Sequence, residues 1–175
     1  ARNGNGACSE PVAMKCIRAK YGIRLLTSYA EKYGASGPSS LIDQERGSTR
    51  FTDGKWLGYE GVNSEIILDL GGIKRVQGGG LSCLRLISSW IFLPVQVDFL
   101  ASTDGSDFKL VKSIIPEPAS DSDPDTSIEL KADFDVQARY IKIVARNQGV
   151  CPAWHAGAGG KSWLFIDETW LTANN

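Results

Sequence analysis

The chain has 175 residues, of which 42% are hydrophobic and 22% are charged, and this balance suits one soluble globular domain with a sizeable core. The formal net charge of -1 argues against nucleic acid or an anionic membrane as the main partner, because both attract clustered Lys and Arg. No apolar run approaches the roughly 20 residues that a membrane-spanning helix needs, so no membrane insertion is expected.

The N-terminal sequence starts at Ala1 and shows no signal-peptide pattern, which favours a mature or excised fragment. We expect residues 1–14 to be a disordered leader or an inter-domain remnant. Residues 15–175 are expected to form one domain, because no linker-like stretch divides the middle of the chain.

Strand signals dominate the chain. The alternation is clearest at 94–102, where Val95, Val97 and Phe99 point to one side, and 138–146 repeats it. Turn residues separate the strands, including Asp104-Gly105 in a hairpin and the glycines at 78–80, which we interpret as a flexible turn. The expected strands are 23–28, 64–70, 81–88, 94–102, 107–114, 126–131, 138–146 and 163–171.

About eight short strands, with no convincing amphipathic helix between them, predict an antiparallel sandwich or jelly roll. A parallel α/β fold would need crossover helices, and the chain has no segment to supply them.

The four cysteines, Cys8, Cys16, Cys83 and Cys151, include no CxxC pair, so a zinc site is not expected. Three disulfide connectivities are open, and so is the alternative that Cys83 and Cys151 are buried or unpaired thiols.

The residue inventory argues against catalysis. His155 is the one histidine, and no GxSxG segment is present to form a Ser-His-Asp triad with it. Glycoside hydrolysis needs two facing carboxylates, whereas the acidic residues here fall mostly in turns and on solvent faces. The glycines at 78–80 lack the Lys-Ser/Thr of a phosphate-binding loop. We therefore expect a non-catalytic domain.

Aromatic residues in Gly-rich, polar segments are the most informative feature. They are Trp56 and Tyr59, then Trp90, then Trp154 beside His155. Sugars present C–H groups on one face and hydroxyls at the edge, so proteins bind them with an aromatic platform and a few fixed polar groups. These five residues are therefore candidate ligand-binding residues.

Position along the chain separates these candidates. Trp154 is flanked by Pro152 and a Gly-rich run, which favours a ligand role, and Asn147 is a polar candidate nearby. Trp56 and Trp163 adjoin predicted strands, which favours a place in the core. For Trp90 both interpretations stay open.

An oxygen-rich turn at 40–49 is a candidate cation site. Asp43, the hydroxyl of Ser48 and several carbonyls in a tight bend are the donors that calcium prefers. An Asp-capped turn is the structural alternative.

Several segments in order resemble F5/8 type C (discoidin-like) domains, and most of all family 32 carbohydrate-binding modules at the C-terminus of bacterial family 20 β-hexosaminidases, the chitobiase type. The resemblance covers roughly residues 15–172. It rests on LLTSYAEKYGASGPSSLIDQERGSTRFTDGKWLGYEG (25–61), LDLGGIKRV (68–76), SWIFLPVQVDFLASTDGSDF (89–108), ARYIKIVARN (138–147) and CPAWHAGAGGKSWLFIDE (151–168).

The resemblance implies a galactose-binding domain-like jelly-roll β-sandwich of two antiparallel sheets. It implies a sugar site that uses Trp154 and a structural Ca²⁺, whose ligands map onto the carbonyls of Ser40, Glu45 and Asp167, the carboxylates of Asp43 and Glu168, and Ser48. Gln44 and Ser48 stand where the family usually has Gly and Thr. The His-Arg-Asn trio of galactose binders is not recognisable.

By this resemblance the chain is an extracytoplasmic module (periplasmic, cell-surface or secreted). It would hold a parent hydrolase in the same polypeptide near terminal sugars such as galactose or N-acetylhexosamine. The main alternative is a structural or protein-docking domain without sugar binding. An adhesion domain for phospholipid or a receptor and a small hydrolase are two further alternatives.

Overall fold

Antiparallel strands build almost the whole of residues 21–174, the part of the chain that the computed structural model describes. The residue bounds of the strands are β1 Gly22–Leu25, β2 Leu57–Glu60, β3 Ser64–Arg85, β4 Gln96–Ser102, β5 Lys109–Ile114, β6 Thr126–Arg146 and β7 Trp163–Asn174. Three short 3-10 helices lie between them: η1 Glu31–Tyr33, η2 Pro38–Ile42 and η3 Ile87–Ser89. The predicted leader, Cys8 and Cys16 lie outside the described residues.

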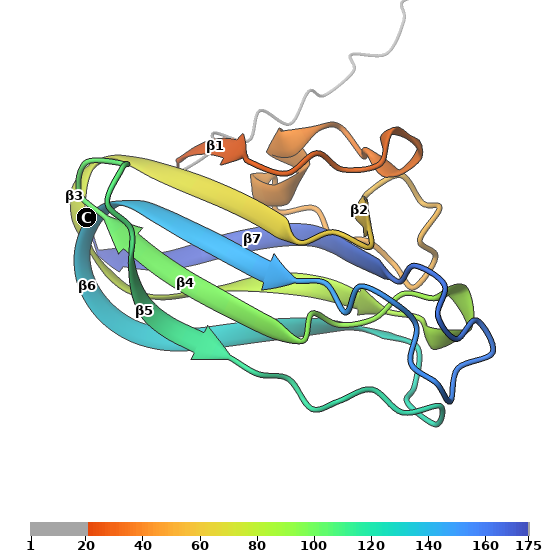
Figure 1. The fold of residues 1–175 in the computed structure, drawn as a ribbon. Helices are drawn as coiled ribbons and strands as arrows, with labels where there is room; N and C mark the ends of the chain where they lie inside the picture. The colour runs from red at the N-terminus through yellow and green to blue at the C-terminus, as the bar shows by residue number, and fades with distance from the viewer. Residues whose placement is uncertain (1–20, 175) are drawn as a thin grey trace, which may run out of the picture.

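Two long strands, β3 and β6, connect the two layers of the sandwich (Figure 1). They pair along most of their length, and irregularities between Asp69 and Lys74 and between Val76 and Gly78 bend the pair. One layer contains β1, the first half of β3, the second half of β6, β4 and β5. The other contains β2, β7 and the remaining halves of β3 and β6. The predicted all-β jelly-roll sandwich is confirmed.

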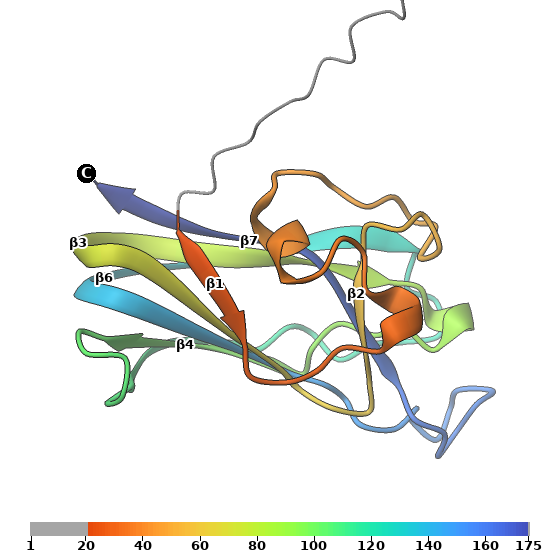
Figure 2. The same cartoon turned by 90° about the horizontal axis from the view of Figure 1, so that it is seen from above.

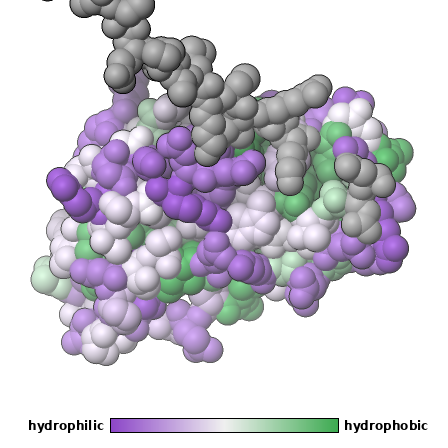
Figure 3. Space-filling model, turned by 180° about the vertical axis from the view of Figure 1, so that it is seen from behind, coloured by the Kyte–Doolittle hydropathy of each residue, from purple (hydrophilic) through white to green (hydrophobic). Residues whose placement is uncertain are grey.

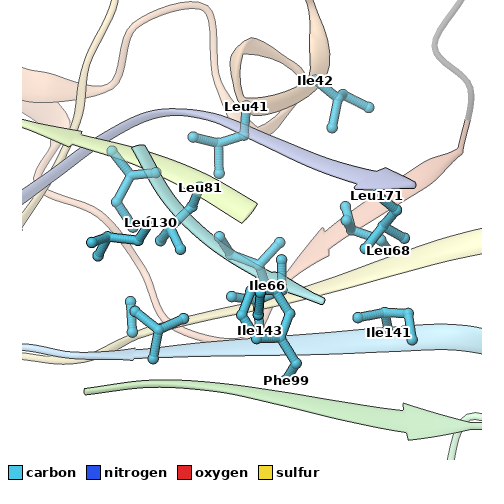
Figure 4. Packing of buried hydrophobic residues seen from close by; sticks show 14 of the residues in the cluster. Leu41, Ile42, Ile66, Leu68, Leu81, Phe99, Leu130, Ile141, Ile143 and Leu171 are labelled. Carbon is cyan, nitrogen blue, oxygen red and sulfur yellow. The ribbon is translucent and has the colours of Figure 1, made fainter. Parts of the chain in front are cut away.

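Alternating apolar residues from both layers fill the interior. Ile66, Leu81, Phe99 and Ile143 are fully buried, and their side chains interdigitate between the sheets (Figure 4). Leu41 enters this cluster from η2, which covers the sandwich beside β7 (Figures 2 and 4). A second cluster at the loop end is built mainly from rings: Trp56, Leu84, Ile91, Trp163 and Phe165.

The glycines at 78–80 are strand residues of β3 and not the flexible turn that we predicted. A side chain on Gly80 would overlap the indole of Trp170, and one on Gly79 would lie 2.9 Å from Leu171. The sequence therefore uses glycine here so that side chains of β7 can lie against the β3 backbone. Because this stretch is extended, the two strands predicted at 64–70 and 81–88 are one.

The connections divide between the two ends of the sandwich. The hairpin between β4 and β5 turns at Gly105, with φ 80°, as predicted for Asp104-Gly105. The loop 147–162 and η3 lie at the opposite end (Figures 1 and 2). Over residues 21–174, no helix has the length and apolar character to cross a bilayer.

Candidate ligand site at the loop end

The loop 147–162 is anchored by the side chain of Asn147. Its amide nitrogen donates to the carbonyl of Tyr59 at 3.0 Å, and its Oδ1 accepts from the Gly149 N–H and the Ser162 hydroxyl, both at 2.7 Å. The sequence placed Asn147 among the ligand-binding candidates. In the structure its polar atoms hold the loop to β2 and to the start of β7.

His155 fastens the same loop to η3. Its Nδ1 accepts the N–H of Gly157 at 2.9 Å, so the ring proton is on Nε2, which donates to the carbonyl of Ile87 at 2.8 Å. The residue is only 8% exposed. Both ring nitrogens are therefore engaged, which corrects the expectation that the imidazole faces a ligand.

Trp154 is the exposed member of an aromatic cluster. Its ring packs edge-to-face on His155 and Phe92, with centroids 5.9 and 6.3 Å away, and it remains 45% exposed. These contacts restrict the indole without covering it. Trp154 therefore has the properties of a fixed platform.

Trp90 also packs edge-to-face against His155, with the ring centroids 6.3 Å apart. Its backbone is left-handed, with φ 65°, and the residue is 40% exposed. Its indole lies against the backbone of Gly157 and Gly160, where an added Cβ would come within 2.5 and 2.9 Å of the ring. Gly157 and Gly160 therefore leave the space that the Trp90 indole occupies.

A groove of about 510 Å³ opens beside Trp154. Four prolines form much of its apolar wall: Pro94, Pro116, Pro118 and Pro152. A half-buried ion pair supplies polar groups, because Nη1 of Arg85 lies 3.1 Å from the Asp123 carboxylate and Nε donates to the carbonyl of Pro124. Gln148 also lines the groove. An aromatic face, rigid C–H walls and a few fixed polar groups are what a pyranose ring needs.

Two other predicted ligand residues belong to the interior. Trp56 is 1% exposed, with its indole N–H bonded to the carbonyl of Ser48, and Tyr59 is 0% exposed. Neither ring has a face open to a ligand, so both leave the set of candidates. Trp163 is buried too, as predicted.

The candidate cation site forms where the loop 43–47 meets β7. The strand pairing skips Asp167, since Ser82 pairs with Glu168 and Cys83 with Ile166. This bulge lets Asp167 and Glu168 face the same loop. Glu168 accepts the N–H of Gln44 at 2.6 Å, and Asp167 accepts that of Gly47 at 2.7 Å.

Gln44 adopts φ 66°, the left-handed conformation that favours glycine. The tight bend therefore persists although Gln stands where the resembling family usually has Gly. The bend directs the Gln44 N–H at the carboxylate of Glu168.

The oxygens left over fit a hard cation. Oδ1 of Asp167 is buried without a hydrogen bond, with Nη1 of Arg46 as an ionic partner 3.7 Å away. Oδ1 of Asp43 accepts the Glu45 N–H, which leaves its Oδ2. Burial, reinforced by the charges of Asp43 and Asp167, raises the pKa of Glu168 to about 7. Burial also raises the pKa of Asp167. A bound cation would relieve this crowding of carboxylates.

The remaining predicted calcium ligands lie around the same loop. Ser40 is buried, the Glu45 side chain turns to Lys55 at 3.3 Å, and the Ser48 hydroxyl donates to Asp53 at 2.8 Å. Within residues 21–174, no three His, Cys, Asp or Glu side chains stand together as a metal cluster. An ion here would therefore depend on backbone carbonyls as well as on carboxylates.

Sequence reasoning missed the polar residues of the groove, Arg85, Asp123 and Gln148. Asp123 lies in a Pro/Asp/Ser stretch that is typical of a solvated turn, and Arg85 ends a strand. Their meeting depends on the path of the connection between β5 and β6, and no local pattern encodes that path. The four prolines were a visible signal, because a rigid wall is one use of proline in a loop.

No protein-family model matches the sequence, and a comparison with curated proteins gives no match. Solved structures do match. One is CpGH89CBM32-5 from Clostridium perfringens in complex with GalNAc-β-1,3-galactose, with a TM-score of 0.56 and 18% identity over 88% of this chain and 96% of that one. Another is the CBM32 of AlyQ in complex with 4,5-unsaturated mannuronic acid, with a TM-score of 0.55 and 16% identity over 86% and 93%.

A third match is a pectin-binding carbohydrate-binding module, with a TM-score of 0.53 and 14% identity over 90% of this chain and 94% of that one. At these identities the comparisons establish the fold. The chain therefore has the β-sandwich fold that these carbohydrate-binding modules share.

Proposed function

We propose that this chain is a non-catalytic carbohydrate-binding module whose sugar site is the groove beside Trp154. The observation that carries the proposal is the geometry of Trp154, a half-exposed indole fixed by His155 and Phe92 at a groove of about 510 Å³. The indole would stack on the C–H face of a pyranose ring. Arg85, Asp123 and Gln148 would bond its hydroxyls.

The similar solved structures support this function. Two of them contain a bound carbohydrate, GalNAc-β-1,3-galactose or 4,5-unsaturated mannuronic acid, and the third is described as pectin-binding. For this chain, we propose terminal sugars of the galactose or N-acetylhexosamine type. We also propose an extracytoplasmic location and a parent glycoside hydrolase of the β-hexosaminidase type. Binding at one such site is weak on its own and gains from attachment to an enzyme that holds the same glycan.

We further propose a structural Ca²⁺ between the loop 43–47 and β7. Asp43 and Glu168 would supply carboxylate oxygens, and Ser40, Glu45, Asp167 and Ser48 the remaining donors. The support is one buried carboxylate oxygen without a hydrogen bond, Oδ1 of Asp167, next to Glu168, whose pKa burial raises to about 7. The ion would tie the loop to the sandwich and has no part in sugar binding.

A broad glycan array followed by calorimetric titration tests the sugar-binding function. We expect binding of at least one neutral terminal sugar, and its loss in Trp154→Ala while the circular dichroism spectrum stays unchanged. Val150→Ala is the matched control, because Val150 is exposed in the same loop but does not line the groove. No binding by correctly folded protein to any glycan would favour the structural or docking alternative.

A further inference from the structure

One wall of the groove beside Trp154 is acidic. The connection between β5 and β6, residues 115–125, contains four carboxylates and no Lys or Arg: Glu117, Asp121, Asp123 and Asp125. Two of them, Glu117 and Asp123, line the groove itself.

The positive charge of the one cation that lines the groove is already balanced. Arg85 is 14% exposed at its side chain, with Nη1 paired to Asp123 at 3.1 Å and Nε donating to the carbonyl of Pro124 at 3.1 Å. Asp123 in turn accepts the N–H and the hydroxyl of Ser120. The pair is neutral as a unit and holds the wall to the end of β3.

Glu117 carries the charge that remains. It is exposed, and within residues 21–174 no Lys or Arg side chain forms an ion pair with it. With the Arg85–Asp123 pair neutral, the lining therefore has an excess of one negative charge, beside an apolar wall that lowers the local dielectric constant.

We propose that this groove selects sugars with a free amine, of the glucosamine type, and discriminates against uronic acids, with Glu117 as the specificity-determining residue. The inference rests on the proposed function, because it concerns the same groove and the same stacking on Trp154. An ammonium on the sugar would approach the Glu117 carboxylate, whereas a sugar carboxylate would meet like charge and no unbalanced positive charge.

The test compares three tetrasaccharides by titration at low salt and a pH at which the amine is protonated: tetraglucosamine, its fully N-acetylated form and tetragalacturonate. We expect tetraglucosamine to bind about three- to tenfold more tightly than the N-acetylated form, and tetragalacturonate to bind most weakly. The preference for the amine should shrink in 0.5 M salt, because both charges are near solvent.

Glu117→Gln should reduce the amine preference to about twofold or less, mainly through weaker binding of tetraglucosamine. Asp107→Asn is the charge-matched control, since Asp107 lies in the exposed β4–β5 hairpin at the far end of the sandwich (Figure 1). Equal binding of all three sugars, or strongest binding of the uronate, would overturn the selectivity and leave the proposed function standing. Absence of binding to every sugar, with the array also blank, would overturn both.

Discussion

The imidazole of His155 shows how one residue can shape a binding surface without touching the ligand. It bonds the backbone of its own loop on one side and that of η3 on the other, and its ring supports both Trp154 and Trp90. Its place in the interior explains why a search for a catalytic or ligand-facing histidine misleads here.

Removal of this imidazole should destabilise the protein. In His155→Ala, the carbonyl of Ile87 and the N–H of Gly157 both lose their partner, and the cavity adds to the cost. We expect a loss of about 2–4 kcal/mol in the free energy of unfolding, measured by urea denaturation. A loss below about 0.5 kcal/mol would show that the loop 147–162 keeps its structure without the imidazole.

At the scale of elements, Asp98 joins three strands of one layer. The carboxylate on β4 accepts from Ser113 on β5 at 2.6 Å and from Arg146 on β6 at 2.8 Å. Burial alone would raise the pKa of Asp98, but donation by Ser113, Gln96 and Arg146 brings it below the usual value. The charged carboxylate is therefore the form that the fold prefers.

This preference predicts a specific pH dependence. Because the folded pKa is depressed, the stabilisation is present above the unfolded value of about 3.9 and disappears as the pH falls through the folded value. Asp98→Asn should cost about 1.5–3 kcal/mol at pH 7, and the difference from wild type should narrow as the pH falls below the unfolded value of about 3.9. Asp135→Asn serves as the control, since its pair with Arg75 is exposed and should change little. A stability difference between wild type and Asp98→Asn that does not change with pH would contradict the proposed role of the charged carboxylate.

The glycines of β3 give a second prediction for an element. A Cβ at Gly80 would meet the Trp170 ring and lie 2.8 Å from the carbonyl of Leu130. Gly80→Ala should therefore cost about 1–3 kcal/mol through overpacking, while Gly72→Ala, which meets nothing within 4 Å, should be tolerated. Urea unfolding of both variants checks this. Equal stabilities of Gly80→Ala and Gly72→Ala would favour the flexible turn that the sequence suggested at 78–80.

These elements also mark what the sequence could predict. The alternation in 94–102 and 138–146 identified β4 and the end of β6, because side-chain period follows directly from the pleat. The glycines at 78–80 misled, because the residues that need the space, Trp170 and Leu171, lie far along the chain. Trp154 could be selected from its flanking residues, whereas the burial of Tyr59 depends on β2, a strand too short to be predicted.

For the whole molecule, the two proposed sites lie at different places on the sandwich. The groove lies beside Trp154, and the candidate calcium site lies between the loop 43–47 and β7. Where its residues are coloured, the face in Figure 3 shows mainly hydrophilic and neutral residues, with hydrophobic ones in separate groups.

Removal of calcium should destabilise the whole domain, because the ion would offset the repulsion that Asp43 and Asp167 exert on Glu168. We expect EDTA to lower the melting temperature at pH 7, and added Ca²⁺ to restore it. Glu168→Gln should lose this response, since it removes a ligand together with the charge. An unchanged melting curve of the wild-type protein in EDTA would remove the calcium proposal.

The central claim is that the groove beside Trp154 receives a sugar, and an NMR titration tests it most directly. The chain has five tryptophans, whose indole N–H signals serve as separate reporters. On addition of lactose or N,N′-diacetylchitobiose, we predict that the Trp154 indole and the side-chain signals of Arg85 and Gln148 shift together, while the buried Trp56 indole stays fixed. No shift with either sugar, or shifts confined to other parts of the domain, would contradict the claim.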